Sequence, residues 1–176
     1  RWKRVGRNST GNAFGGLVAT HARSDGFMDR GYEMTDLMFK AGIAPNENHS
    51  LGVKLSWYDN EANISYRGLF LEDYRKGRTY NPAPDDYYLT DRKGIDLNHE
   101  WHLSDRATLR TLAYWSELTR DYWRYGVNAG ASSAAGRWVY TDAQTGNNRT
   151  FERTGLETRL SLDHDLFGWI NEAEFI

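Results

Sequence analysis

Apolar and polar residues alternate with a period of two along much of the chain. The clearest stretch is 94–101, where the apolar residues Ile95, Leu97 and Trp101 fall on alternate positions, against Asp96, Asn98 and Glu100. The ranges 37–43, 51–57 and 156–162 repeat this pattern, and 14–23 shows it more weakly. Side chains of a β-strand point alternately to opposite faces, so the pattern predicts strands with one apolar and one polar face.

The register can be stated residue by residue. We expect Leu51, Val53, Leu55 and Trp57 to lie on one face together with Ile95, Leu97 and Trp101, and Lys54, Asp96 and Glu100 to lie on the other. In 109–119 both sets of positions carry large residues, and we expect the apolar face to comprise Leu109, Thr111, Ala113 and Trp115. A shift of one residue would invert each of these assignments.

Short and long connections alternate between the expected strands. Short polar turns occupy 8–12, 44–49, 103–107 and 163–168, and longer segments occupy 24–34, 60–90 and 120–149. In a meander of antiparallel strands, successive connections lie at opposite ends of the sheet. The sequence therefore predicts an antiparallel sheet with short turns at one end and long loops at the other.

The composition fits strands that have one solvent-exposed polar face better than it fits a protein with a large apolar core. The 176 residues have a mean hydropathy of -0.76, yet they include 7 Trp, 11 Tyr and 7 Phe. We interpret the fold as all-β, a portion of an antiparallel transmembrane β-barrel with short periplasmic turns and long extracellular loops. Residues that fit its aromatic girdles are Trp57, Trp101, Trp115 and Trp169. A soluble β-sandwich that serves as a binding or adhesion module is the alternative, since it also alternates with period two.

Several function classes lose support at this point. The net charge of -2 provides no general attraction to nucleic acid, and the lack of cysteine excludes disulfides and thiolate metal sites. No nucleotide-binding or hydrolase motif is present, so we expect neither an enzyme nor a cofactor. His99 and His102 are three residues apart, which places them on opposite faces of a strand and argues against a shared metal ion.

The stretch "YEMTDLMFKAGIAPNENHSLGVKLSWYDNEANI" (32–64) resembles TonB-dependent outer-membrane siderophore receptors, in particular the ferric citrate receptors. The positions that match the family pattern are Asp36, Lys40, Pro45, Glu47, His49, Tyr58, Glu61 and Ala62. The stretch 68–101 is similar to the loop and strand that follow in the family.

This resemblance implies that 1–176 is part of the receptor's barrel domain in the cell outer membrane. It would supply about seven strands of 22, and the plug domain and the remaining strands would lie elsewhere in a longer protein. The expected partners are outer-membrane lipid, a ferric siderophore such as ferric citrate, and the TonB system. Receptors of this family with other cargo, such as haem, another metal chelate or a vitamin, remain open.

Arg and Tyr residues gather in and beside the two longest connections. We expect the ligand-binding residues to be Arg78, Arg92, Arg120, Arg124, Tyr80 and Tyr122. A guanidinium pairs with a carboxylate through two parallel hydrogen bonds, which suits an anionic, oxygen-rich ferric chelate. The alternative is a solvated rim in which acidic residues neutralise each Arg locally, namely Asp73, Asp85, Asp86, Asp91 and Asp121.

Charged residues also occupy the expected interior face of the strands: Lys40, Lys54, Glu157, Arg159 and Asp163. They could contact the plug or line a transport pathway. We favour an internal lattice of ion pairs that keeps the wall polar.

Overall fold

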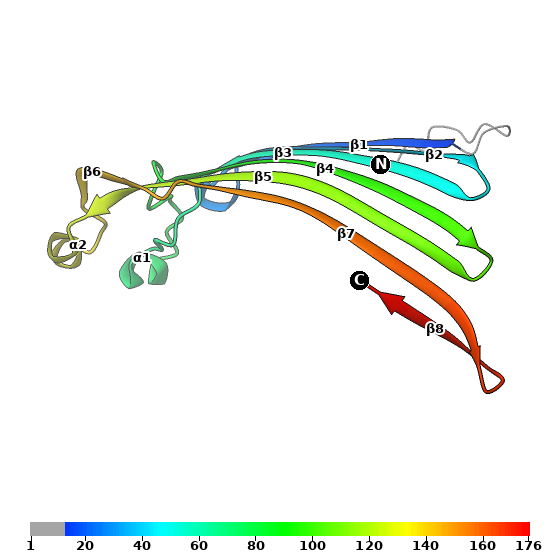
Figure 1. The fold of residues 1–176 in the computed structure, drawn as a ribbon. Coiled ribbons are helices and arrows are strands. Elements are labelled where there is room, and N and C mark those ends of the chain that lie inside the picture. Colours follow the sequence, from blue (N-terminus) through cyan, green and yellow to red (C-terminus); the bar gives the residue numbers. More distant parts are fainter. Residues whose placement is uncertain (1–12) are drawn as a thin grey trace.

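The computed structural model describes residues 13–176, which form one antiparallel β-sheet (Figure 1). Its strands are β1 (Ala13–Ser24), β2 (Tyr32–Asn46), β3 (His49–Ala62), β4 (Tyr87–Ser104), β5 (Ala107–Val127), β6 (Tyr140–Gly146), β7 (Arg149–Leu166) and β8 (Trp169–Phe175). A 3-10 helix, η1 (Phe27–Asp29), and two short helices, α1 (Leu71–Arg75) and α2 (Ala129–Ala135), lie in the connections. The expected turn at 8–12 falls outside the described residues.

The strands follow one another as a meander. Their order is β1-β2-β3-β4-β5-β7-β8, and β6 pairs with the far end of β5, ahead of β7. The all-β class and the antiparallel arrangement are thus confirmed, with seven strands in the main path. All eight strands belong to a single sheet, so residues 13–176 contain no second sheet of the kind that a β-sandwich requires.

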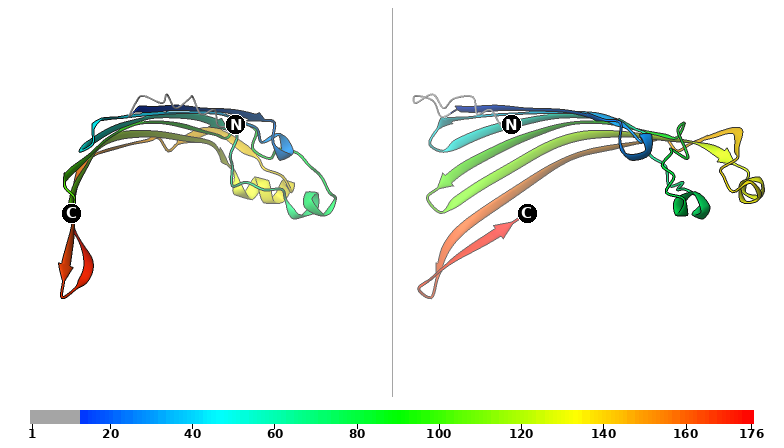
Figure 2. Two further views of the ribbon diagram at one scale, coloured as in Figure 1. Left: turned by 90° about the vertical axis from the view of Figure 1, so that its right-hand side faces the viewer. Right: turned by 180° about the vertical axis from the view of Figure 1, so that it is seen from behind.

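The sheet is curved and open. Viewed along its strands it forms an arc, with β1 and β8 at its two edges and with α1 and α2 on its concave side (Figure 2). Within residues 13–176, no helix is both long enough and apolar enough to span a membrane.

Short and long connections lie at opposite ends of the strands, as predicted (Figure 1). The short turns are 47–48, 105–106 and 167–168, and we call their side of the sheet the turn end. The connections 25–31, 63–86 and 128–139 lie at the other side, which we call the loop end. In the last of them, Asn128 caps α2 by accepting a hydrogen bond from the Ala131 amide at 2.9 Å, and Gly136 ends the helix at φ 63°.

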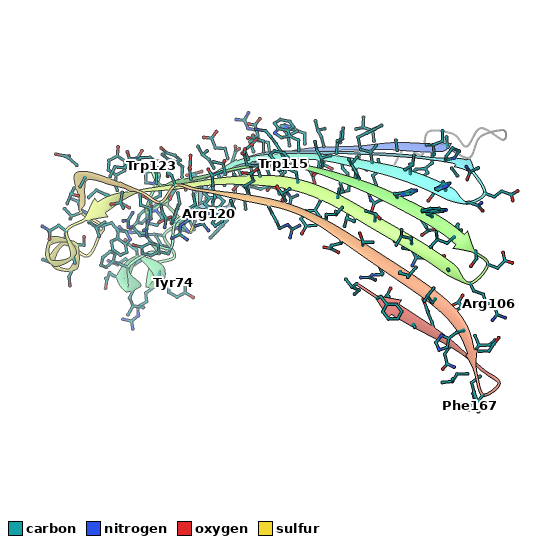
Figure 3. The ribbon with its side chains drawn as sticks, viewed as in Figure 1. Tyr74, Arg106, Trp115, Arg120, Trp123 and Phe167 are labelled. Carbon is teal, nitrogen blue, oxygen red and sulfur yellow. The ribbon has the colours of Figure 1, made fainter. Side chains whose placement is uncertain are left out.

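One expected boundary was wrong. The segment 120–149 is not a single connection, because β5 continues to Val127 and β6 and β7 pair along it. Aromatic contacts extend the pairing: Tyr87 stacks with Trp123 at 6.4 Å between ring centroids, and Tyr88 meets Tyr122 at 6.0 Å. Trp115 accordingly lies within β5 rather than near its end (Figure 3).

The register separates two faces as the alternation predicted. Cross-strand partners place Phe39, Leu55, Ile95 and Trp115 in one row. Lys54, on the opposite face, pairs with Asp96 across the strands at 2.5 Å between Nζ and Oδ2. The expected face assignments of β3 and β4 are therefore confirmed.

Contacts at the loop end identify which face is concave. Tyr66 belongs to the segment that leads into α1, which lies on the concave side (Figure 2), and Arg124 of β5 lies 5.1 Å from its ring. Arg124 shares its face of β5 with Tyr114, the cross-strand partner of Asp96. Lys54 and Asp96 therefore face the concave side, and Leu55, Ile95 and Trp115 face the convex side.

The convex face is apolar and uncovered. Leu55 is 42% exposed, Leu97 52% and Leu156 70%, whereas the buried apolar residues within 13–176 are Ala62 and Ala83. Burial of apolar surface is the main force that favours folding, so the described part of the chain lacks a core of its own. An apolar surrounding at the convex face would supply what is missing.

Candidate ligand-binding site

The concave face divides into two zones along the strands. Toward the turn end three ion pairs form on this face: Lys54 with Asp96, Arg110 with Glu100 at 2.7 Å, and Arg159 with Glu174 at 3.2 Å. The expected interior ion pairs are thus confirmed for Lys54 and Arg159, whereas Lys40, Glu157 and Asp163 form none within residues 13–176. A hollow of about 610 Å³ lies over this zone, and its lining includes Lys40, Lys54 and Arg159.

Toward the loop end the same face carries unpaired cations. We call them the arginine cluster: Arg92 of β4, Arg120 and Arg124 of β5, and Arg149 and Arg153 of β7. Among residues 13–176, none of the five forms an ion pair with a carboxylate. The concave face thus carries charges of both signs near the turns, several of them in ion pairs, and unpaired arginines near the loops.

One row of the cluster is poorly compensated within the chain. Arg120 and Arg149 are direct cross-strand partners, and Thr90 is the partner of Arg120 on its other side. Like charges directly opposite each other destabilise a sheet. In addition, Arg120 Nε and Thr90 Oγ1 are buried and have no hydrogen-bond partner in the described part of the chain. Buried polar atoms are normally satisfied, so these unpartnered donors make the row a candidate for binding an anion.

Tyrosine rings cover the faces of several of these guanidinium groups. Arg124 lies 5.1 Å from the ring centroid of Tyr66 and 4.9 Å from that of Tyr122. Arg92 lies 5.6 Å from the Tyr58 ring, and Arg153 lies 5.0 Å from the Tyr114 ring. A ring over the flat face of a guanidinium leaves the N–H groups along its edge free to donate, and these are the groups that bind carboxylates bidentately.

A glycine makes room for one of these stacks. A Cβ at position 155 would lie 2.4 Å from the Tyr114 Cζ, so only glycine allows the ring to cross the neighbouring strand. Tyr114 thereby reaches Arg153 on β7.

The structure brings four of the six predicted ligand residues together and separates two. Arg92, Arg120, Arg124 and Tyr122 share the concave face at the loop end. They lie on strands, not in connections as predicted for 120–149.

Arg78 and Tyr80 form a separate group around Asp73, beside α1. Arg78 Nη1 lies 3.0 Å from Asp73 Oδ1, and the Tyr80 hydroxyl donates to Asp73 Oδ2 at 2.6 Å. This hydrogen bond, together with burial, raises the pKa of Tyr80. The geometry here matches the alternative of local neutralisation, and ligand contact by these two residues stays a prediction.

Sequence reasoning did not single out Arg149 or Arg153, and it noted Tyr66 among the Arg and Tyr residues of 60–90 without choosing it as a ligand residue. The residues of 149–155 do alternate, with Arg149, Phe151 and Arg153 on one face and Thr150, Glu152 and Thr154 on the other. Neither face is apolar enough to signal a strand by hydrophobicity. Tyr66 shows no local signal, since its place depends on how 63–86 folds back over the sheet.

Comparison with solved structures finds the same architecture in iron transport receptors. No protein-family model and no curated protein sequence matches the chain. A structure described as the ferric citrate transporter FecA in the unliganded form matches 94% of this chain with a TM-score of 0.79 and 21% identity.

The ferric-catecholate import receptor Fiu from E. coli K12 also matches, in two forms. Its closed form covers 88% of the chain with a TM-score of 0.64 and 14% identity, and its open form covers 94% with a TM-score of 0.66 and 13% identity. The match extends over 23%, 25% and 29% of the three solved chains, so this chain spans about a quarter of their length. At these identities the likeness shows the fold alone.

Proposed function

We propose that residues 1–176 form part of the barrel domain of a TonB-dependent outer-membrane receptor that takes up a ferric siderophore, ferric citrate or a similar carboxylate chelate. The plug domain, the TonB-contacting segment and the other strands would belong to the rest of a longer protein. The fold shared with FecA and Fiu supports the receptor class.

A lipid environment is supported by the convex face. Its exposed apolar band is bordered toward the loop end by Trp57 and Trp115, whose indole N–H groups donate to Asp91 at 2.9 Å and Glu152 at 2.8 Å. Both carboxylates lie farther toward the loop end than the indoles they bind. An indole with its ring toward hydrocarbon and its N–H toward water is typical of a membrane interface. With this orientation the arginine cluster opens toward the exterior.

The observation that carries the choice of cargo is the unpaired state of the arginine cluster. A row with two opposed guanidinium groups, a buried unpartnered Nε and a buried unpartnered hydroxyl favours an oxygen-rich anion. A ferric polycarboxylate offers several carboxylates to such donors, and the local positive field would raise its concentration at the mouth.

A ferric catecholate is the second candidate cargo. It is favoured by Tyr66 and Tyr122, which flank Arg124 on the same face. Flat aromatic chelates stack on such rings, whereas citrate has no ring to stack. Comparing the two chelates in a single binding assay distinguishes these candidates.

The test is chelate affinity of the full-length receptor and of single variants. Losing a hydrogen bond to a charged group costs about 1.5–3 kcal/mol, so Arg120→Ala and Arg124→Ala should each weaken ferric citrate binding roughly ten- to hundredfold. Arg120→Lys should recover only part of this, because an ammonium lacks the planar fork.

The matched control is Lys76→Ala, which removes a cation at the same end of the sheet that is already paired with Glu72 at 2.9 Å. We expect it to bind like the parent. Growth with ferric citrate as the sole iron source, with surface expression verified, gives the second measurement. If Arg92→Ala, Arg120→Ala and Arg124→Ala all bind and grow like the parent, the cluster is a solvated rim and the carboxylate cargo is wrong.

A further inference from the structure

A buried ion pair joins three segments at the loop end. Asp86 is 1% exposed and Arg67 is 4% exposed. Arg67 Nη1 donates to both carboxylate oxygens of Asp86, at 3.0 Å and 2.7 Å, and Nη2 donates to the carbonyl of Tyr125 in β5. The carboxylate also accepts from the Ser65 hydroxyl at 2.6 Å and from the Tyr125 amide at 3.2 Å.

These bonds fix the backbone on both sides of Tyr66. Ser65 precedes it and binds Asp86, and Arg67 follows it and binds Asp86 and β5. Arg30 adds a further tie, since its guanidinium donates to the carbonyls of Ser65 and Arg67. Tyr66 is itself 71% exposed, so little packing holds its ring from outside.

The same pair also fixes the other side of the stack. Tyr125 follows Arg124 directly, and both its amide and its carbonyl are bound by the ion pair. The ring of Tyr66 and the guanidinium of Arg124 therefore approach to 5.1 Å from two backbones that the pair holds together.

The buried pair is explained better by the positions it fixes than by the stability it adds. Removing two charges from water is costly, and a buried pair is often no more stabilising than apolar residues of equal volume. The chain nevertheless keeps both charges buried beside a solvent-exposed tyrosine. Directional bonds to three segments give a fixed distance that apolar packing would not enforce.

We infer that Arg67 and Asp86 are positioning residues that hold the Tyr66 ring against Arg124 and so fix where this ring lies in the proposed cargo site. The expected effect of this positioning on cargo binding rests on the proposed function. Neither residue needs to touch the cargo.

The first experiment measures position without cargo. A nitroxide label is attached at Tyr66→Cys in the full-length receptor freed of other cysteines, and its mobility is read by electron paramagnetic resonance. Asp86→Asn and Arg67→Lys should both sharpen the label's spectrum. The matched control, Asp73→Asn, weakens the pair between buried Asp73 and exposed Arg78 in the same connection, away from Tyr66, and should leave the spectrum unchanged. Ser65→Ala removes one bond to Asp86 and should sharpen the spectrum by a smaller amount.

The second experiment is a double-mutant cycle on chelate affinity. Tyr66→Ala alone should weaken binding roughly three- to tenfold, the range of a partly exposed cation–π contact. In the Asp86→Asn background it should cause almost no further loss, because the ring is already displaced.

The outcomes separate the two claims. An unchanged spectrum in Asp86→Asn, with the protein folded, overturns the positioning role. A mobile label with additive effects on affinity overturns the link between Tyr66 and the site. If the parent binds neither ferric citrate nor a ferric catecholate, the proposed function fails, and the spectrum alone decides the positioning role.

Discussion

Replacing Leu55 with Arg tests whether the convex face meets lipid. Leu55 lies in the middle of β3 on that face, with Phe39 and Ile95 as its cross-strand partners. A charge on the lipid side of a barrel costs about 2–4 kcal/mol at the bilayer midplane and about 0–1 kcal/mol near the interface, so Leu55→Arg, two residues inside the Trp57 girdle position, should cost an intermediate amount of about 1–3 kcal/mol. On a water-exposed sheet the same change would stay within about 0.5 kcal/mol, because Leu55 is 42% exposed and fills no core.

The control uses the same strand and the same face at another depth. Asp59 lies four residues farther toward the loop end, about 14 Å along the strand, beyond the Trp57 girdle position. Asp59→Arg should cost only about 0–1 kcal/mol, or stabilise slightly, since Asp91 is its cross-strand partner. The assay is urea unfolding of the full-length receptor refolded into lipid vesicles. If both variants lose less than about 1 kcal/mol, the convex face does not meet hydrocarbon and the barrel interpretation is refuted.

Three further expectations concern the turn end, the Asp73 group and the sheet edges. Phe167 adopts φ 53° in the turn before Gly168, so Phe167→Asn should raise the free energy of unfolding by about 1 kcal/mol in a urea titration, and a loss would contradict the strain. Tyr80 has a raised pKa, so its contribution is fully present below the ordinary value of 10.0 and is lost as pH rises through the folded pKa. The stability difference between the parent and Tyr80→Phe should therefore be constant near neutral pH and shrink above about pH 10, and a constant difference throughout would disprove the linkage. Residues 1–176 alone should associate through the open edges at β1 and β8, and a monodisperse, cooperatively unfolding 20.3 kDa monomer in plain buffer would contradict this.

The strands and turns were predictable because their signals are local. Alternation in β3 and β4 assigned each side chain to its face, and the turns at 47–48 and 105–106 lie inside the polar segments that the sequence marked. The far part of β5 and the start of β7 were missed because Glu117, Thr119, Asp121 and Glu152 on their convex face are polar, and because Trp123 and Tyr125 farther along alternate with the equally large Tyr122 and Arg124. Period two therefore continues there without a hydrophobic signal.

The candidate site was only partly predictable, because pairing depends on the tertiary path of 63–86. The sequence indicated that acidic residues could neutralise nearby arginines, but it did not say which ones. Asp73 pairs with Arg78 and Asp86 with Arg67, which removes both arginines from the set of free cations. Arg120 stays unpaired because its strand neighbours on that face are Thr90 and Arg149.

The arginine cluster is not evident from the sequence, because an acidic residue adjoins three of its five members. Asp91 precedes Arg92, Asp121 follows Arg120, and Glu152 precedes Arg153, so each pair is neutral when read along the chain. A strand sends adjacent side chains to opposite faces, and the sheet thus sorts these neutral pairs into acids on the convex side and arginines on the concave side. The segregation explains how a chain with a net charge of -2 presents a cationic surface. It also means that a register shift of one residue in β4, β5 or β7 could put Asp91, Asp121 or Glu152 on the concave face in place of Arg92, Arg120 or Arg153, so strand register determines the charge of the site.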